Sequence, residues 1–300
     1  MWTLACDSDR WLGFRARDDD IIISTPAKCG TTWTQMLVAL LIFDSPELPA
    51  SLARLSPWVD QSVRPIAEVL ADLEAQTHRR FPKSHLPFDA LPHDDRITYI
   101  TVGRDPRDVY LSVRSHFANT RFDVVMQDRA ASVGTEDLLE IPAFEMPPID
   151  RVEGFWHWVE HDSAGTPGMA EMLRIVDSFW QRRHEPNVVL LHYAELKTDL
   201  VGQMAYLAER LGFDRARARL EELAPAASFE GMKSAAERYA PNADQGHFVD
   251  PARFFNKGES GRWRSFLTDD DLPRYDQRVA ELVSPELARW LHSGTSQPTA

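Results

Sequence analysis

The chain repeats a pattern of short apolar strand, tight loop and apolar helix. Residues 21–24 read Ile-Ile-Ile-Ser after an aspartate run, and a short β-branched run is typical of a strand buried on both faces of a parallel sheet. After the loop at 26–30, residues 31–43 place apolar side chains at helical spacing. A second unit has a strand at 97–102 and a helix at 107–117. The pattern therefore predicts an alternation of strands and helices.

The second half of the chain continues this alternation. In the second unit, Asp105 is suited to cap the helix and Pro106 to occupy its first position. Residues 118–148 carry several prolines and scattered aromatics, and we expect them to be irregular. An apolar run at 188–193 predicts a further strand. The expected helices lie at 169–184, 200–211, 216–223 and 229–238, with a loop at 241–262 and two short helices at the end.

Alternating strands and helices predict an α/β fold with a central parallel sheet and helices on both faces. With no repeat and no Gly-, Pro- or Ser-rich linker, we expect residues 1–300 to form one domain. Within it, the irregular and helical region at about 118–186 is expected to lie on one side of a ligand site. Ligands of such sheets bind at the carboxyl ends of the strands, so the loops that follow the strands are where chemistry is expected.

Composition excludes several classes of protein. A hydrophobic content of 43% and a charged content of 26% exclude disordered and low-complexity chains. The longest apolar run, residues 36–43, is far shorter than the ~20 residues of a membrane span, and no secretory signal opens the chain. Two cysteines, Cys6 and Cys29, suit a reducing compartment. We therefore expect a cytoplasmic protein without a membrane span.

The charge balance also bears on partners. The chain has 33 basic and 46 acidic residues, a net charge of −13. This excess disfavours binding to nucleic acid and to anionic membranes. Taken alone, the net charge also disfavours an anionic small ligand, but the basic residues of single loops bear on this more directly.

The loop at 28–33 reads Lys-Cys-Gly-Thr-Thr-Trp and lies between a strand and a helix. A helix N-terminus offers free N–H groups and a positive dipole end to an anion. Gly30 lets the backbone approach a ligand, Thr31 and Thr32 add hydroxyl donors, and Lys28 adds a point charge. The order differs from a Walker loop, in which the Lys follows the second Gly. The alternative is an ordinary strand–helix turn capped by Thr.

A second candidate pair is Arg104, at the end of a strand, with Ser112 on the following helix. An Arg in this position can bind a phosphate through two parallel hydrogen bonds. The alternative is a salt bridge from Arg104 to Asp105 or Asp108.

Together these segments resemble the cytosolic sulfotransferase family. The loop at 28–33 resembles its 5′-phosphosulfate loop, and residues 102–109 with Ser112 are similar to its 3′-phosphate motif, including the Arg-to-Ser spacing. Lys83-Ser84-His85-Leu86-Pro87 resembles its catalytic Lys-x-His-Leu-Pro segment. Ser228-Phe229 and residues 257–263 resemble its later cofactor segments. The matches keep the family's order and extend from about residue 21 to 268.

The resemblance implies transfer of a sulfuryl group from 3′-phosphoadenosine 5′-phosphosulfate (PAPS) to a hydroxyl or amine, leaving adenosine 3′,5′-diphosphate. It also implies a P-loop-like parallel sheet. A transferring sulfuryl group carries less charge than a phosphoryl group, which usually enlists Mg²⁺, and no carboxylate stands beside the loop to hold a metal. We therefore expect no metal cofactor.

The resemblance further implies roles for single residues. His85 would be the general base, a role that its ordinary pKa of ~6.5 suits; Lys83 would steady the sulfuryl group and Lys28 the departing oxygen. The 5′-phosphosulfate loop and Arg104 would hold the donor's acidic groups, with Cys29 as a small filler where the family often has Ser. The implied donor-binding residues are Lys28, Cys29, Gly30, Thr31, Thr32, Trp33, Arg104, Ser112, Tyr193, Phe229, Lys257 and Gly258.

Among these, Trp33 and Phe229 would sandwich the adenine and Tyr193 would contact it, although buried aromatics more often serve a core. The local field of such a cleft, with Lys28, Lys83, Arg104 and Lys257, outweighs the net charge.

Two positions depart from the family pattern. Asn256 stands where the family commonly has Arg, and Ala227 where it commonly has Thr. Losing one charge-assisted contact costs about 1.5–3 kcal/mol. Either donor binding is weaker, or Arg253 or Arg262 substitutes. The family's short dimer signature is not recognisable in residues 266–282, so the oligomeric state, a homodimer included, stays open.

The acceptor is the least determined part. An apolar pocket would suit a phenol, an alcohol or a glycolipid, and acidic residues nearby would suit an amine. The aromatic and apolar residues that would line it, or else form a core, are Phe117, Phe122, Phe144, Met146, Phe155, Trp156 and Trp158. Two other functions remain open: a P-loop-type nucleotide kinase, and a nucleotide-binding module that has lost catalysis.

Overall fold

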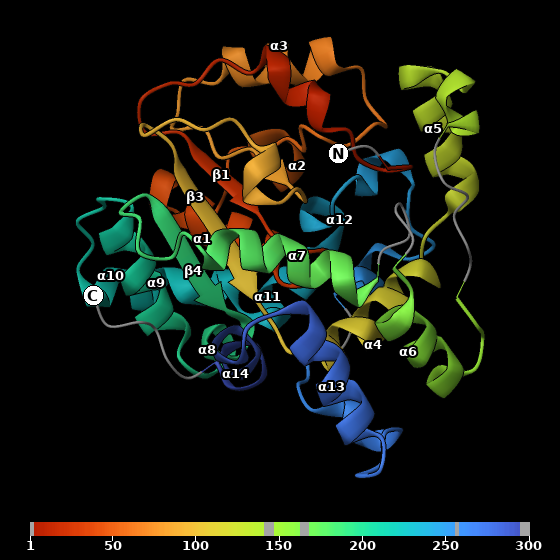
Figure 1. Ribbon diagram of the computed structural model, residues 1–300. Coiled ribbons are helices and arrows are strands. Elements are labelled where there is room, and N and C mark those ends of the chain that lie inside the picture. Colours follow the sequence, from red (N-terminus) through yellow and green to blue (C-terminus); the bar gives the residue numbers. More distant parts are fainter. Residues whose placement is uncertain (1–2, 141–146, 163–167, 256–257, 295–300) are drawn as a thin grey trace.

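A computed structural model describes residues 3–140, 147–162, 168–255 and 258–294. At its centre lies a 4-stranded parallel sheet in the order β2-β1-β3-β4, with helices on both faces (Figure 1). The strands are β1 (Ile21–Ser24), β2 (Lys83–Ser84), β3 (Thr98–Gly103) and β4 (Val188–His192). The α/β fold with a central parallel sheet, predicted from the alternation of strands and helices, is confirmed.

The helices surround this sheet and supply most of the remaining structure. They are α1 (Thr31–Phe43), α2 (Leu52–Leu55), α3 (Ile66–Ala75), α4 (Pro106–Phe117), α5 (Phe122–Val133), α6 (Arg151–Glu160), α7 (Met169–Trp180), α8 (Tyr193–Thr198), α9 (Leu200–Arg210), α10 (Arg217–Leu223), α11 (Phe229–Ser234), α12 (Ala236–Tyr239), α13 (Leu272–Leu282) and α14 (Pro285–Ser293).

Both faces of the sheet are buried, because successive side chains of a strand point to opposite faces. Ile21 and Ile23 belong to a hydrophobic cluster with α1, α9 and α10. Ile22 belongs to the cluster on the other face, with Ile175 and Phe179 of α7. All three isoleucines are inaccessible to solvent. This double burial explains why β1 reads as a continuous apolar run.

The predicted elements differ from the observed ones in a few places. Residue 193 begins α8 instead of ending β4, and the predicted helix at 229–238 is divided at Ala235 into α11 and α12. β2 was not predicted, since two residues carry no periodicity. The prediction that residues 118–148 are irregular is wrong for α5. Its inward face includes Arg129, only 2% exposed, which donates to Leu4 O at 3.0 Å, and a buried Arg conceals the helical pattern.

The edge strand β2 is positioned by its neighbours. Ile21 and Ile23 of β1 donate backbone hydrogen bonds to Arg80 O at 2.9 Å and Pro82 O at 3.0 Å. The Arg80 side chain binds the Asp20 carboxylate through Nε at 2.9 Å and Nη2 at 2.5 Å. A paired contact of this kind fixes direction as well as distance. It therefore holds the segment leading to Lys83 in place beside β1.

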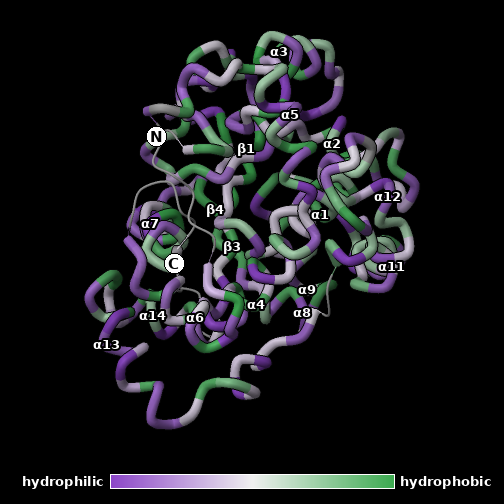
Figure 2. The backbone as a smooth tube through the Cα atoms, turned by 90° about the vertical axis from the view of Figure 1, so that its right-hand side faces the viewer, coloured by the Kyte–Doolittle hydropathy of each residue, from purple (hydrophilic) through white to green (hydrophobic). Residues whose placement is uncertain are grey.

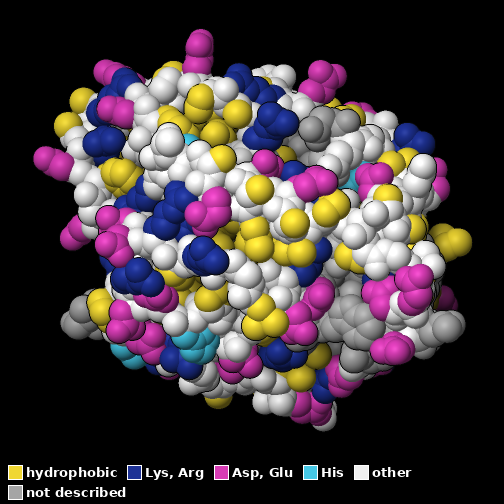
Figure 3. Space-filling view, turned by 90° about the horizontal axis from the view of Figure 1, so that it is seen from above, with side chains coloured by type: hydrophobic (Ala, Val, Ile, Leu, Met, Phe, Trp, Pro, Cys, Tyr) yellow, Lys and Arg dark blue, Asp and Glu magenta, His cyan; other side chains and the backbone are white. Residues whose placement is uncertain are grey.

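At the periphery, α13 is a largely hydrophilic stretch (Figure 2). On the face seen from above, acidic and basic side chains are interspersed (Figure 3). No helix within the described ranges is both long and apolar enough to cross a bilayer.

We expect Arg80→Met to lower the free energy of unfolding by about 3–5 kcal/mol, because it leaves a buried carboxylate unpaired. The Arg80 and Asp20 side chains are only 1% and 2% exposed. Urea denaturation measures the loss. Arg96→Met is the control: Arg96 pairs with Asp94 but is 52% exposed, so its loss should stay below about 1 kcal/mol. Equal losses in the two variants would contradict the structural role of the buried pair.

Candidate active site

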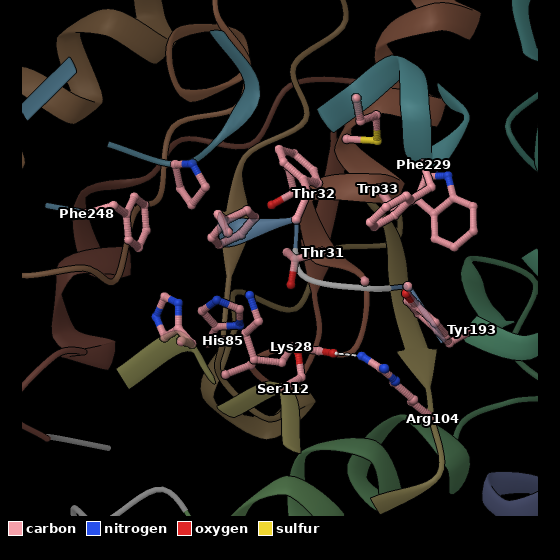
Figure 4. Close-up of a pocket in the computed structure, with 18 of the residues that line it drawn as sticks. Lys28, Thr31, Thr32, Trp33, His85, Arg104, Ser112, Tyr193, Phe229 and Phe248 are labelled. Carbon is pink, nitrogen blue, oxygen red and sulfur yellow. Dashed lines mark hydrogen bonds between the residues drawn. The ribbon is translucent and has the colours of Figure 1, made fainter. Parts of the chain in front are cut away.

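A cavity of about 740 Å³ lies where the carboxyl ends of all four strands meet. The loop after β1 brings Lys28, β2 is followed at once by His85, β3 by Arg104, and β4 by Tyr193. These side chains gather in one place from distant parts of the chain (Figure 4). The parallel arrangement, in which every strand ends at the same edge, is what brings them together.

The loop after β1 is shaped for an anion. Lys28 and Gly30 have φ of 66° and 116°, in the left-handed region. Thr25 and Thr31 join the two ends of the loop through a hydroxyl–hydroxyl hydrogen bond of 2.6 Å. Within the described residues no side chain caps the start of α1, so the first N–H groups of that helix stay available for a ligand.

Arg104 is tied to this loop from the neighbouring strand. Its Nη1 donates to Lys28 O at 2.7 Å, and its guanidinium lies over the Tyr193 ring at 4.0 Å. The side chain is 8% exposed, and its buried Nε has no hydrogen-bond partner within the described residues. The alternative salt bridge is not seen there: Asp105 pairs instead with Arg107 at 2.8 Å. Arg104 can therefore still donate a hydrogen bond to a ligand.

Helix α4 presents a polar face to the cavity. Asp108, Ser112 and His116, at four-residue spacing, all line it. Asp108 accepts the backbone N–H of Gly261 at 2.7 Å and that of Arg262 at 3.1 Å. Burial raises the pKa of this carboxyl. These bonds dock the late loop of the chain onto α4 and bring it to the cavity.

Aromatic rings form a slot at one end of the cavity, with Trp33, Tyr193 and Phe229 grouped together (Figure 4). The Trp33 and Tyr193 rings meet edge to face with centroids 5.4 Å apart. Gly258 has φ of 62°, and a Cβ there would lie 2.8 Å from Phe229 Cδ2. Only glycine therefore fits between the late loop and the Phe229 ring. Trp33 and Tyr193 are half-buried rather than enclosed in the core.

His85 is held in one orientation. Its Nδ1 lies 2.5 Å from Thr25 O; a carbonyl only accepts, so Nδ1 carries the proton and Nε2 is left as an acceptor. The backbone N–H of His85 donates to Asp60 Oδ2 at 3.2 Å, and its ring packs edge to face on Trp58. Burial, together with the positive charge of Lys83, lowers the pKa of His85 to about 3. The imidazole is therefore neutral.

Two lysines add positive charge to the same space. Burial, followed by repulsion from Arg104 and Lys83, lowers the pKa of Lys28 to about 7. Burial likewise lowers the pKa of Lys83 to about 8, against the attraction of Asp60. Their ammonium groups lie 3.8 Å from the centroids of aromatic rings, those of Phe254 and Trp58 respectively. Two buried lysines with lowered pKa values beside Arg104 indicate a place for an anion.

Comparison with known proteins shows the family of this chain. A model of the sulfotransferase domain matches residues 18–286. The chain is 42% identical to a glycolipid sulfotransferase of Mycobacterium bovis and 41% identical to one of Mycobacterium tuberculosis. Each comparison covers 97% of this chain and 93% of the relative. The chain belongs to the sulfotransferase domain family. It is a sulfotransferase, and the kinase alternative is set aside.

A solved structure supports the fold. Retinol dehydratase, in a complex with retinol and PAP, superposes with a TM-score of 0.70 at 20% identity, covering 93% of this chain and 85% of that one. At this level of identity the likeness concerns the fold alone, an α/β sheet flanked by helices.

The structure brings most of the predicted site residues of this sulfotransferase together. Those that line the cavity are Lys28, Gly30, Thr31, Thr32, Trp33, Lys83, His85, Arg104, Ser112, Tyr193, Phe229 and Gly258. Lys257 and Asn256 lie outside the described residues. Of the two cations considered as substitutes, Arg262 lines the cavity, whereas Arg253 is exposed at the surface.

Cys29 lies in the loop after β1, but its side chain points away from the cavity. Its side chain is fully buried in the hydrophobic cluster that includes Val109, and it is not among the side chains that line the cavity. Burial raises the pKa of its thiol to about 12. Cys29 therefore fills space behind the loop, and its side chain does not reach a ligand in the cavity. Ala227 is also fully buried.

The predicted acceptor residues divide between cavity and core. Phe117 and Phe122 line the cavity. Phe155 and Trp158 are buried in the core, and Trp156 packs against that core. Phe144 and Met146 lie outside the described residues.

Several cavity residues escaped prediction from the sequence. His116 follows Ser112 by one helical turn, so the spacing alone would have placed both on one face. Gln61, Asn242 and Phe248 also line the cavity, but they come from irregular segments that carry no periodic signal. Within the described ranges, no group of three or more His, Cys, Asp or Glu side chains is placed to hold a metal ion.

We expect Gly30→Ala to weaken binding of adenosine 3′,5′-diphosphate at least about tenfold, because a Cβ forces the loop out of its φ of 116°. That Cβ would also lie 3.3 Å from Tyr193 Cδ2. Calorimetry measures the affinity. Gly212→Ala is a matched control, since Gly212 has φ of 72° with nothing within 4 Å of a Cβ. It should lose similar stability, about 1–3 kcal/mol, yet keep its affinity. An affinity loss shared by both variants would contradict the role of the Gly30 loop.

Proposed function

We propose that this sulfotransferase transfers the sulfuryl group of PAPS to a hydroxyl of a glycolipid, with His85 as general base. The observation that carries the proposal is the convergence of Lys28, Lys83 and Arg104 with the start of α1 around one cavity. The choice of acceptor rests on the mycobacterial relatives, which are glycolipid sulfotransferases and match almost the whole chain.

The cavity suits a sulfuryl donor that carries anionic phosphosulfate and phosphate groups. The buried Nε of Arg104 has no partner within the described residues, and its guanidinium is already aligned by Lys28 O and Tyr193. The aromatic slot of Trp33 and Phe229 suits the flat face of an adenine. Retinol dehydratase, which shares the fold, is described in complex with PAP, the abbreviation for adenosine 3′,5′-diphosphate. PAPS would supply the activated sulfuryl group.

In the proposed reaction His85 Nε2 accepts the proton of the acceptor hydroxyl as its oxygen attacks sulfur. The bond from sulfur to the bridging phosphate oxygen breaks, and Lys28 neutralises the charge that develops on that oxygen. Lys83 stays close to the sulfuryl oxygens. The bond from His85 Nδ1 to Thr25 O keeps Nε2 directed for this role. Negative charge in the site would raise the depressed pKa of His85 and so strengthen it as a base.

The acceptor end of the cavity is compatible with a lipid. Phe248 lies on the opposite side of His85 from Trp33 and Phe229 (Figure 4). Phe117, Phe122 and Val125 line the cavity as well, and these side chains offer an apolar wall for an acyl chain. We further propose that the chain acts as a single sulfotransferase domain, since one family model spans residues 18–286.

Incubation with PAPS and a mycobacterial glycolipid extract should give sulfated product, detected by mass spectrometry. We expect His85→Ala to lower turnover at least about 100-fold, the usual contribution of a general base. Its affinity for adenosine 3′,5′-diphosphate should change less than about threefold, because the substitution leaves the proposed contacts to the phosphate groups in place.

His184→Ala, a substitution outside the cavity, is the matched control. Near-normal turnover in His85→Ala would refute the assignment of the base. Tight binding of Mg-ATP without binding of the bisphosphate would refute the donor, and binding without product would favour the inactive module.

Donor affinity should fall as pH rises, because anion binding needs Lys28 protonated and its pKa is about 7 in the free protein. Between pH 7 and pH 9 we expect the affinity for adenosine 3′,5′-diphosphate to fall about tenfold or more, with proton uptake on binding. Lys28→Arg, which stays charged throughout, should show a flatter profile. Calorimetry in buffers of different ionisation enthalpy measures both quantities. Parallel profiles in the two proteins would exclude Lys28 as the titrating group.

A further inference from the structure

The acceptor end of the cavity has one polar wall among its aromatic side chains. Gln61, Asn242 and His247 line it, and each comes from an irregular segment rather than from the sheet. No role in donor binding or proton transfer requires them. The same end is otherwise lined by rings such as Phe117 and Phe248. A set of amide and imidazole groups in an apolar setting needs an explanation, because unpaired polar groups are costly there.

These groups form one hydrogen-bonded relay. His247 Nε2 lies 2.7 Å from Asp128 Oδ2, and since a carboxylate only accepts, the imidazole proton is on Nε2. His247 Nδ1 is then an acceptor, and Asn242 Nδ2 donates to it at 3.3 Å. The second hydrogen of the same amide is directed to Gln61 Oε1 at 3.0 Å. The relay thus fixes the orientation of both amides.

The relay leaves two polar atoms unused. Within the described residues, Asn242 Oδ1 and Gln61 Nε2 have no hydrogen-bond partner. Neither of them is among the fully buried atoms without a partner. Asn242 therefore keeps a free acceptor and Gln61 a free NH₂ donor, on two side chains that line the cavity. A hydroxyl group both donates and accepts, so neighbouring sugar hydroxyls match this pair, whereas a hydrocarbon would leave it unpaired.

The surroundings extend the polar surface. Gln61 and Asn242 also line a second cavity of about 190 Å³, together with Arg54, Arg64 and Asp72. Nearer the reacting end, His116 lines the main cavity, and its Nδ1 is buried without a partner in the part of the chain that the structure describes. The His116 ring packs against Phe248 at 5.6 Å. Further polar groups therefore lie near the relay, among them the unpartnered Nδ1 of His116.

The relay is also built on a rigid frame. His247 is 3% exposed, and its carbonyl accepts the backbone N–H of Arg121 at 2.9 Å. Asp128 lies on α5, the helix that also supplies Phe122 and Val125 to the apolar wall. One helix thus carries the apolar wall and the end of the polar relay. An acceptor with a sugar and a chain would meet both at once.

We propose that Gln61 and Asn242, oriented by His247 and Asp128, form a subsite for the hydroxyl groups of a carbohydrate. The sugar of the acceptor lies against this pair, and its lipid lies along the side chains of α5. This subsite rests on the proposed glycolipid function and adds to it the residues that select a sugar-bearing acceptor over a simple alcohol.

The test compares two ligands that differ only by the sugar, octyl β-glucoside and 1-octanol. Calorimetry with protein saturated with adenosine 3′,5′-diphosphate, below the micelle concentration, measures both affinities. Gln61→Ala and Asn242→Gly should each weaken glucoside binding about five- to tenfold, as expected for one or two lost hydrogen bonds. Octanol binding should change less than about twofold. The glycine variant keeps the backbone φ of 53° unstrained.

Gln277→Ala, on α13 away from the cavity, is the matched control and should leave both affinities unchanged. Equal losses of affinity for the two ligands, or no loss for the glucoside, would overturn the subsite.

Failure of the proposed function is distinguished from failure of the subsite by measuring sulfation of a glycolipid as well. Selective loss of glucoside binding in a protein that sulfates no glycolipid would support the subsite and refute the acceptor. Normal glucoside binding by both variants of an active glycolipid sulfotransferase would refute the subsite alone.

Discussion

The parallel alignment of four strands is the constraint on which the rest of this molecule depends. It ends every strand at one edge of the sheet, so that loops separated by up to 165 positions (from Lys28 to Tyr193) border one cavity. The edge strand β2 has only two residues, yet it sets the positions of both Lys83 and the following His85. Its position depends on the buried Asp20–Arg80 pair and on backbone bonds from β1. The stability of the fold and the geometry of the cavity are therefore linked at this edge.

The cavity shows how local arrangement overrides net charge. The chain carries −13 overall, yet Lys28, Lys83 and Arg104 border one cavity, and the pKa values of both lysines are lowered there. Arg104 is held against Lys28 O and Tyr193 before any ligand arrives. An anion would relieve this repulsion, and little rearrangement would be needed to receive it. Preorganisation of this kind reduces the entropic cost of binding.

The residues singled out from the sequence that line the cavity belong mostly to short local motifs. The loop after β1, the Arg104–Ser112 pair and the Lys83–His85 segment each lie in a contiguous stretch, so their spacing could be read directly. Prediction failed for helix α5, whose inward positions include polar side chains. Arg129 is buried and Asp128 is half-buried. Residue type alone does not show this, because it depends on what packs against the helix.

The sequence by itself determined the class of fold and which residues after β1, β2 and β3 border the cavity, because these residues lie in contiguous strand–loop–helix units. Only the tertiary structure decided which nitrogen of His85 is free, since that follows from the position of Thr25 O, and how far the pKa values of Lys28 and Lys83 fall. It alone joined Gln61, Asp128, Asn242 and His247 into one relay. Hydrogen bonds and burial between distant segments have no counterpart in the order of residues, so this polar wall of the cavity is seen only in the folded chain.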